Sequence, residues 1–264
     1  MKSLAVAWTR PETVREDIAR VLAMSGFAPA PGAGTAVIAT DHTAPWLPAG
    51  VLAALGRTGE AAPSPGLTPE TRVVLHLLAA RADAALGVGG CLQALAARVG
   101  GVDTEHRSSP ARATVANARA ALDADVSHAF LIDATLVPDG PAPDAPRLPA
   151  NLLLAGRDPV ALDAAVAALM GLAPRSLPLL SHAEEAGMGC VSPDPRALAG
   201  DVTELSRRPL AAWRPETVGA LARLGRRAAR LLLGGTQRPE PVDTPWHVLR
   251  RESDGAAWTP RGEG

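Results

Sequence analysis

The chain alternates short apolar runs with longer stretches in which apolar residues recur every three or four positions. Runs of the first kind are typical of buried β-strands, and stretches of the second kind are typical of amphipathic helices. We predict strands near residues 4–8, 35–40, 72–78, 128–133 and 151–156. Because strands and helices alternate along the chain, the pattern predicts an α/β fold with one mainly parallel sheet and helices on both faces.

Several of the predicted helices carry start or stop signals. Pro11 suits the first turn of a helix that Gly26 closes, and Pro159 suits the first turn of another. Further helices are predicted over residues 91–100, 110–124 and 174–187. The segment between the strand near 128–133 and residue 150 is rich in proline, and we predict a loop there.

The pattern changes beyond about residue 206. Residues 214–235 predict an amphipathic helix with leucines on one side and, on the other, Arg223, Arg226, Arg227 and Arg230. Such a helix could pack on the chain's own body, bind a partner chain or lie on an anionic membrane. The predicted organisation is an α/β domain over 1–206, a basic amphipathic helix within 207–235 and a flexible tail over 236–264.

Composition narrows the function classes. The formal net charge is -1, aromatic residues make up 3% of the chain, and there is no tyrosine. We therefore expect no nucleic-acid partner, because such proteins use basic surfaces and aromatic stacking platforms. Cys91 and Cys190 are too few for a disulfide framework, a four-cysteine zinc site or an iron–sulfur cluster. No run approaches the ~20 apolar residues of a membrane span and no signal peptide is recognisable, so a cytoplasmic protein is expected.

Two carboxylates interrupt the very apolar segment at residues 151–172. Asp158 directly precedes Pro159, and an Asp at this position starts a helix by accepting hydrogen bonds from the free N–H groups of the first turn. Asp163 shares its side of the helix with apolar residues, so it is expected to point towards the sheet. A carboxylate there needs an arginine, backbone donors, a metal ion or a ligand as its partner.

Asp133 ends one predicted strand, and Asp158 follows another. If these strands are neighbours, both acids lie at the carboxyl edge of the sheet, where open α/β folds bind ligands. With Asp163 they would form an acidic wall that could hold a hard cation or a cationic or hydroxylated ligand. The alternative is that Asp133 only caps a turn.

Two other segments could face the acidic wall from the opposite side of a ligand site at this edge of the sheet. His42 follows the strand near 35–40, although a lone histidine is more often a surface group. Gly89 and Gly90 precede a helix that begins at Cys91, so free N–H groups there could receive an anion, or the glycines could form a plain turn. The thiol of Cys91 would be activated by the helix start if exposed and inert if buried.

The segment from residue 152 to 205 resembles the C-terminal half of the domain of unknown function 362 family (DUF 362). That family has a strand, an Asp-Pro-Val-Ala-x-Asp helix ending in Met/Leu-Gly, and a second helix that starts at proline and ends near Gly-x-Gly. The matching positions are Asp158, Pro159, Val160, Ala161, Asp163, Gly171, Pro178, Gly187 and Gly189. Upstream, Asp133, Gly140 and Pro141 match an Asp … Gly-Pro segment, so the resemblance covers about residues 110–205.

The chain departs from the family in its first half. A Pro-Lys-Leu-Lys-Thr-His stretch and a later Lys-Asn pair have lost their lysines, and only His76 or Arg81 could stand in. The ferredoxin-like module of many relatives has no counterpart in this sequence. The three acids favour a protein that binds a small molecule or an ion at the carboxyl edge of the sheet, and the resemblance implies a redox-associated enzyme as one form of it. The alternative is a non-catalytic relative that binds a partner, for example through residues 214–235. Substrate, cofactor and reaction stay unassigned.

Overall fold

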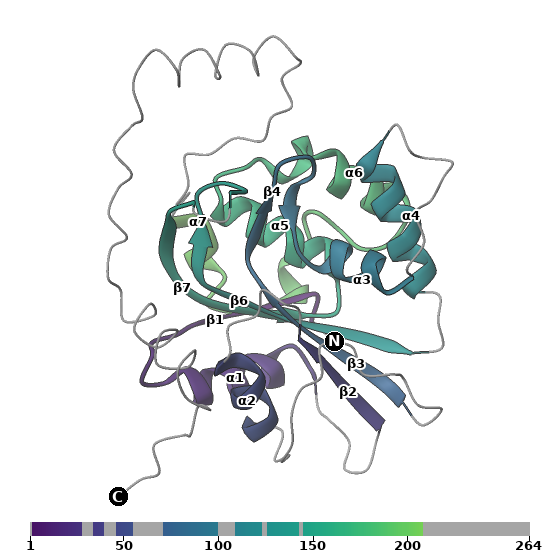
Figure 1. The fold of residues 1–264 in the computed structure, drawn as a ribbon. Coiled ribbons are helices and arrows are strands. Elements are labelled where there is room, and N and C mark those ends of the chain that lie inside the picture. Colours follow the sequence, from purple (N-terminus) through teal and green to yellow (C-terminus); the bar gives the residue numbers. More distant parts are fainter. Residues whose placement is uncertain are drawn as a thin grey trace, which may run out of the picture.

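The structure is a computed structural model of the 264-residue chain. It describes residues 2–27, 34–39, 46–54, 71–99, 109–122, 126–142 and 145–207. His42, the helix predicted over 214–235 and the predicted tail lie outside these residues. Figure 1 shows the described part as a twisted sheet between two layers of helices.

The main sheet contains six strands of the described residues. They are β1 (Leu4–Trp8), β2 (Gly34–Ala39), β3 (Thr71–Ala79), β6 (Ser127–Pro138), β7 (Arg147–Gly156) and β8 (Leu198–Gly200), in the spatial order β2-β3-β6-β7-β1-β8. The pairs β2–β3, β3–β6 and β1–β8 are parallel, whereas β7 runs antiparallel to both of its neighbours. The prediction of a mainly parallel sheet is confirmed, with one reversed strand inside it.

Strands β6 and β7 form a long hairpin, so the prediction of a loop up to residue 150 is wrong. β6 continues to Pro138, which pairs with Arg147, and Leu136 pairs with Pro149. Strand β3 ends opposite Asp133, so among the described residues no strand lies beside this outer part of β6. Proline is tolerated in strands with an unpaired edge, because its missing N–H is not needed there.

Helices cover both faces of the sheet, as predicted (Figure 1). On one face lie α1 (Val14–Met24) and α2 (Trp46–Ala54), and on the other lie α3 (Cys91–Val99), α4 (Pro110–Leu122), α5 (Pro159–Leu169) and α6 (Pro178–Glu185). Alternate residues of each strand point to opposite faces. Leu131 of β6 therefore packs in the cluster with α1 and α2, whereas Phe130 and Ile132 pack in the cluster with α3 to α6.

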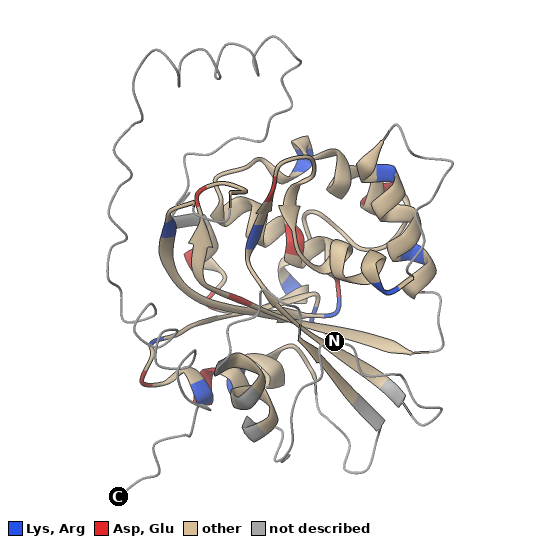
Figure 2. Ribbon diagram, viewed as in Figure 1, with Lys and Arg blue, Asp and Glu red and all other residues tan. Residues whose placement is uncertain are grey.

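Two smaller features of the described residues are a hairpin and a short helix. Strands β4 (Arg81–Asp83) and β5 (Gly87–Gly89) form a short hairpin between β3 and α3, and α7 (Thr203–Arg207) follows β8. Acidic and basic residues are interspersed over the described ribbon in Figure 2. No helix in the described ranges has the length and apolar character needed to cross a membrane.

Helix α5 is buried almost throughout, including Asp163. A helix that is apolar on all sides packs inside a protein and has little contact with water. Figure 1 shows α5 enclosed by the sheet and by its neighbouring helices. Any charged group on α5 must therefore find its partners within the protein.

Candidate functional site

Asp163 caps a helix other than its own. Its side chain is 0% exposed, and its two oxygens accept hydrogen bonds from the backbone N–H groups of Cys91 (2.7 Å) and Leu92 (3.0 Å). These N–H groups open α3 and have no partner within that helix. Asp163 is buried, as predicted, and of the partners considered for it, namely an arginine, backbone donors, a metal ion or a ligand, the structure shows backbone donors. The anion that the Gly89–Gly90–Cys91 segment receives is thus a carboxylate of the same chain.

Burial controls the ionisation of this pair of residues. Burial raises the pKa of Asp163 to about 6, although the two backbone hydrogen bonds act in the opposite direction. Burial also raises the pKa of the Cys91 thiol well above its usual range, and the neighbouring Asp163 raises it further. Cys91 is fully buried, so it fits the alternative of an inert thiol.

Asp158 makes the equivalent connection at the start of α5. Its Oδ1 accepts hydrogen bonds from the N–H groups of Val160 (3.0 Å) and Ala161 (2.9 Å), as an N-cap residue does. Its Oδ2 accepts a third bond from Cys190 N (3.1 Å), which ties the segment after α6 to α5. Both acids of the motif therefore hold backbone segments in place.

Each of these carboxylates lies directly against a glycine. A Cβ atom on Gly90 would overlap Asp163 Oδ1, and one on Gly189 would overlap Asp158 Oδ1. The absence of a side chain at these two positions is what lets the carboxylate reach the backbone donors of the next residue.

We expect Gly90→Ala to lower the free energy of unfolding by about 1 to 2 kcal/mol, because the new methyl group displaces Asp163 from buried N–H groups. The cost should largely disappear when Asp163→Ala is already present, since no carboxylate then has to move. Urea unfolding of the two single variants and the double variant measures this coupling. Additive effects would contradict it.

Asp133 does not join the other two acids. Alternation along β6 places it on the face of Leu131, towards α1 and α2, whereas α5 lies on the opposite face. Its Oδ1 accepts hydrogen bonds from the backbone N–H and the hydroxyl of Thr135, at an irregularity in the β6–β7 pairing. The predicted wall of three acids is therefore wrong. The reason is that β7 runs antiparallel, so Asp158 emerges at the amino end of β6.

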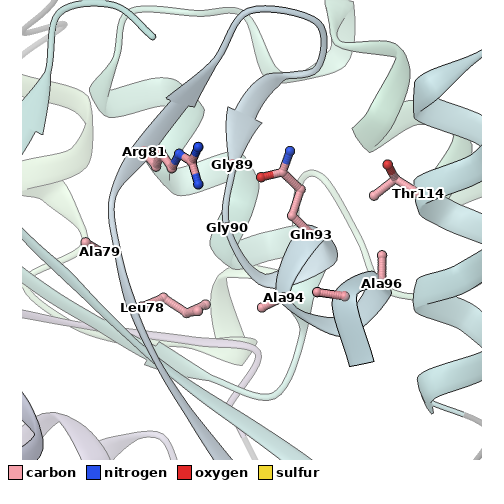
Figure 3. Close-up of a pocket in the computed structure, with 10 residues that line it drawn as sticks. Leu78, Ala79, Arg81, Gly89, Gly90, Gln93, Ala94, Ala96 and Thr114 are labelled. Atoms are coloured by element: carbon pink, nitrogen blue, oxygen red, sulfur yellow. The ribbon is translucent and has the colours of Figure 1, made fainter. Parts of the chain in front are cut away.

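A pocket of about 470 Å³ lies where β3 ends (Figure 3). The end of β3, the β4–β5 hairpin, α3 and α4 all contribute to its wall. The lining residues are Leu78, Ala79, Arg81, Gly89, Gly90, Gln93, Ala94, Ala96, Ala97 and Thr114.

The pocket contains two of the residues that the sequence singled out for a site, Gly89 and Gly90. Asp163 lies behind this wall and holds it, because it binds the residues that follow Gly90. Arg81 also lines the pocket, and it is one of the two residues named above as stand-ins for the lysines of the DUF 362 pattern. Gln93 and Thr114 were missed, since an isolated amide or hydroxyl on a predicted helix carries no signal in the sequence.

His76, the other proposed replacement, belongs to a different cluster. Its Nε2 lies 3.0 Å from Nδ1 of His128, and its ring stacks on Phe130 with centroids 4.9 Å apart. Burial, His128 and Arg98 lower the pKa of His76 to about 3, and burial and Arg98 lower the pKa of His128. Both rings are buried, and neither lines the pocket.

The described residues include no group of three or more His, Cys, Asp or Glu side chains arranged to hold a metal ion. Comparison of the chain with models of protein families, with curated proteins and with solved structures found no match.

Proposed function

We propose that this chain binds a small organic molecule in the pocket at the end of β3. The position of the pocket is the observation that carries the proposal. Ligands of α/β proteins bind beyond the carboxyl ends of parallel strands, and β3 is parallel to both of its neighbours. The volume also fits, because ligand pockets measure roughly 300–1,000 Å³.

The wall of the pocket is preformed, because contacts within the protein hold it in place. Asp163 fixes the start of α3, and Gln93 Nε2 donates a hydrogen bond to Asp83 Oδ2 at 2.9 Å, which ties α3 to the β4–β5 hairpin. A preformed wall reduces the entropy that is lost on binding. In this proposal the acids of the Asp-Pro-x-x-x-Asp motif position the site and do not touch the ligand.

The proposal is for binding and includes no chemical step. The polar side chains that line the pocket are a guanidinium, an amide and a hydroxyl, which orient a ligand. We assign no chemical role to the thiol of Cys91, because it is fully buried and its pKa is raised.

Filling the pocket should abolish binding. Ala97 lines the pocket and is exposed, so Ala97→Trp can place its indole in the cavity without disturbing the core. We expect saturation-transfer NMR with a mixed set of neutral, anionic and cationic fragments to give hits that this variant loses. Ala19→Trp is the matched control, since Ala19 is an exposed helical alanine on the opposite face of the sheet. Hits that survive in Ala97→Trp, or an absence of hits, would refute the proposal.

A further inference from the structure

The polar groups of the pocket lie at one end of it. Figure 3 shows the heads of Arg81 and Gln93 beside the β4–β5 hairpin, with Leu78, Ala94 and Ala96 at the other end. The aliphatic part of the Arg81 side chain lies over Gly89, where no side chain stands in its way. The pocket is therefore polar at one end and apolar at the other.

The guanidinium of Arg81 has no hydrogen bond or ion pair with the residues that the structure describes. The acid in the same hairpin, Asp83, is engaged elsewhere, because it accepts hydrogen bonds from the N–H groups of Ala85 and Leu86 and from the side chain of Gln93. A guanidinium presents N–H donors in a planar fork that matches a carboxylate. Arg81 is thus available to an anionic group that enters the pocket.

The lining residues also indicate the charge of the ligand and the polarity of its body. Arg81 is the one charged side chain among the lining residues, so the pocket matches a single negative charge better than a phosphate dianion. Beyond it the wall consists of leucine, alanines and glycines, which offer hydrocarbon contacts and few hydrogen bonds.

We infer that the ligand is a monoanion with an apolar body, of the class of medium-chain carboxylates. The carboxylate binds Arg81, and the hydrocarbon chain lies against Leu78 and the alanines of α3. This inference rests on the proposed function, because it names the class of ligand for the same pocket.

Isothermal titration calorimetry with octanoate, octanamide and octylammonium at neutral pH tests the inference on the full chain. We expect octanoate to bind best, and Arg81→Gln to weaken it roughly tenfold, as loss of one charge-assisted contact does. Arg81→Lys should retain part of the affinity. Arg196→Gln is the matched control, since Arg196 is exposed and does not line the pocket. Inorganic phosphate should not compete.

The outcomes separate the inference from the proposed function. If octanamide or octylammonium binds as tightly as octanoate, and Ala97→Trp blocks that binding, the pocket binds ligands but the inferred class is wrong. If octanoate binding is unchanged in Arg81→Gln, the inference fails as well. If none of the three probes and no fragment binds, the proposed function itself fails.

Discussion

Replacing Asp163 with alanine is expected to lower the free energy of unfolding by about 3 kcal/mol, because two buried N–H groups lose their acceptor. The two N–H groups lie beside Gly90 and the buried helix α5, which leave no room for water to replace the carboxylate. The loss should also loosen the start of α3 and with it one wall of the pocket.

Urea unfolding at about pH 7.5 measures this effect. Asp83→Ala is the matched control, since Asp83 also accepts two backbone N–H bonds but is partly exposed. Water can satisfy the N–H groups at Asp83, so we expect that variant to cost about 1 kcal/mol or less. The role assigned to Asp163 would be wrong if the two variants cost the same.

The sequence predicted the elements of this fold well and their directions less well. Apolar runs located β1, β2, β3, the first half of β6 and the buried part of β7, because burial in a sheet demands such runs. The apolar pattern of β7 does not predict its direction, because a buried parallel strand and a buried antiparallel strand can have the same pattern. It depends on the link to β6, and prolines made that link look like a loop.

The candidate site shows the same division. The helix start at Asp158 and the partner required by Asp163 follow from local chemistry, and both were predictable. That Asp163 reaches the start of α3 depends on how two helices far apart in the chain pack. The pocket needs four elements to meet, and its arginine sits in a three-residue strand that no periodicity marks.

The largest pH effect is expected from the two histidines below α3. Their hydrogen bond can form between two neutral rings, since one ring then donates and the other accepts. Arg98 and burial oppose a charge on either ring. The unfolded chain takes up a proton on His76 below about pH 6.5, whereas the folded chain resists protonation down to a pKa of about 3. Stability from this source is therefore complete above about pH 6.5 and is lost as the pH falls.

His76→Gln isolates this contribution, because the amide keeps a hydrogen-bonding group near Nε2 but does not titrate. Between about pH 7.5 and pH 5, wild type should lose about 2 kcal/mol more of its unfolding free energy than this variant does. Asp163 acts with the opposite sign, since its folded-state pKa is raised to about 6. It favours the folded state as the pH falls, so the cost of Asp163→Ala should grow by about 1 kcal/mol over the same range. Urea titrations of both variants at the two pH values separate the effects. A cost of His76→Gln that does not change with pH would show that His76 is not held neutral by the fold.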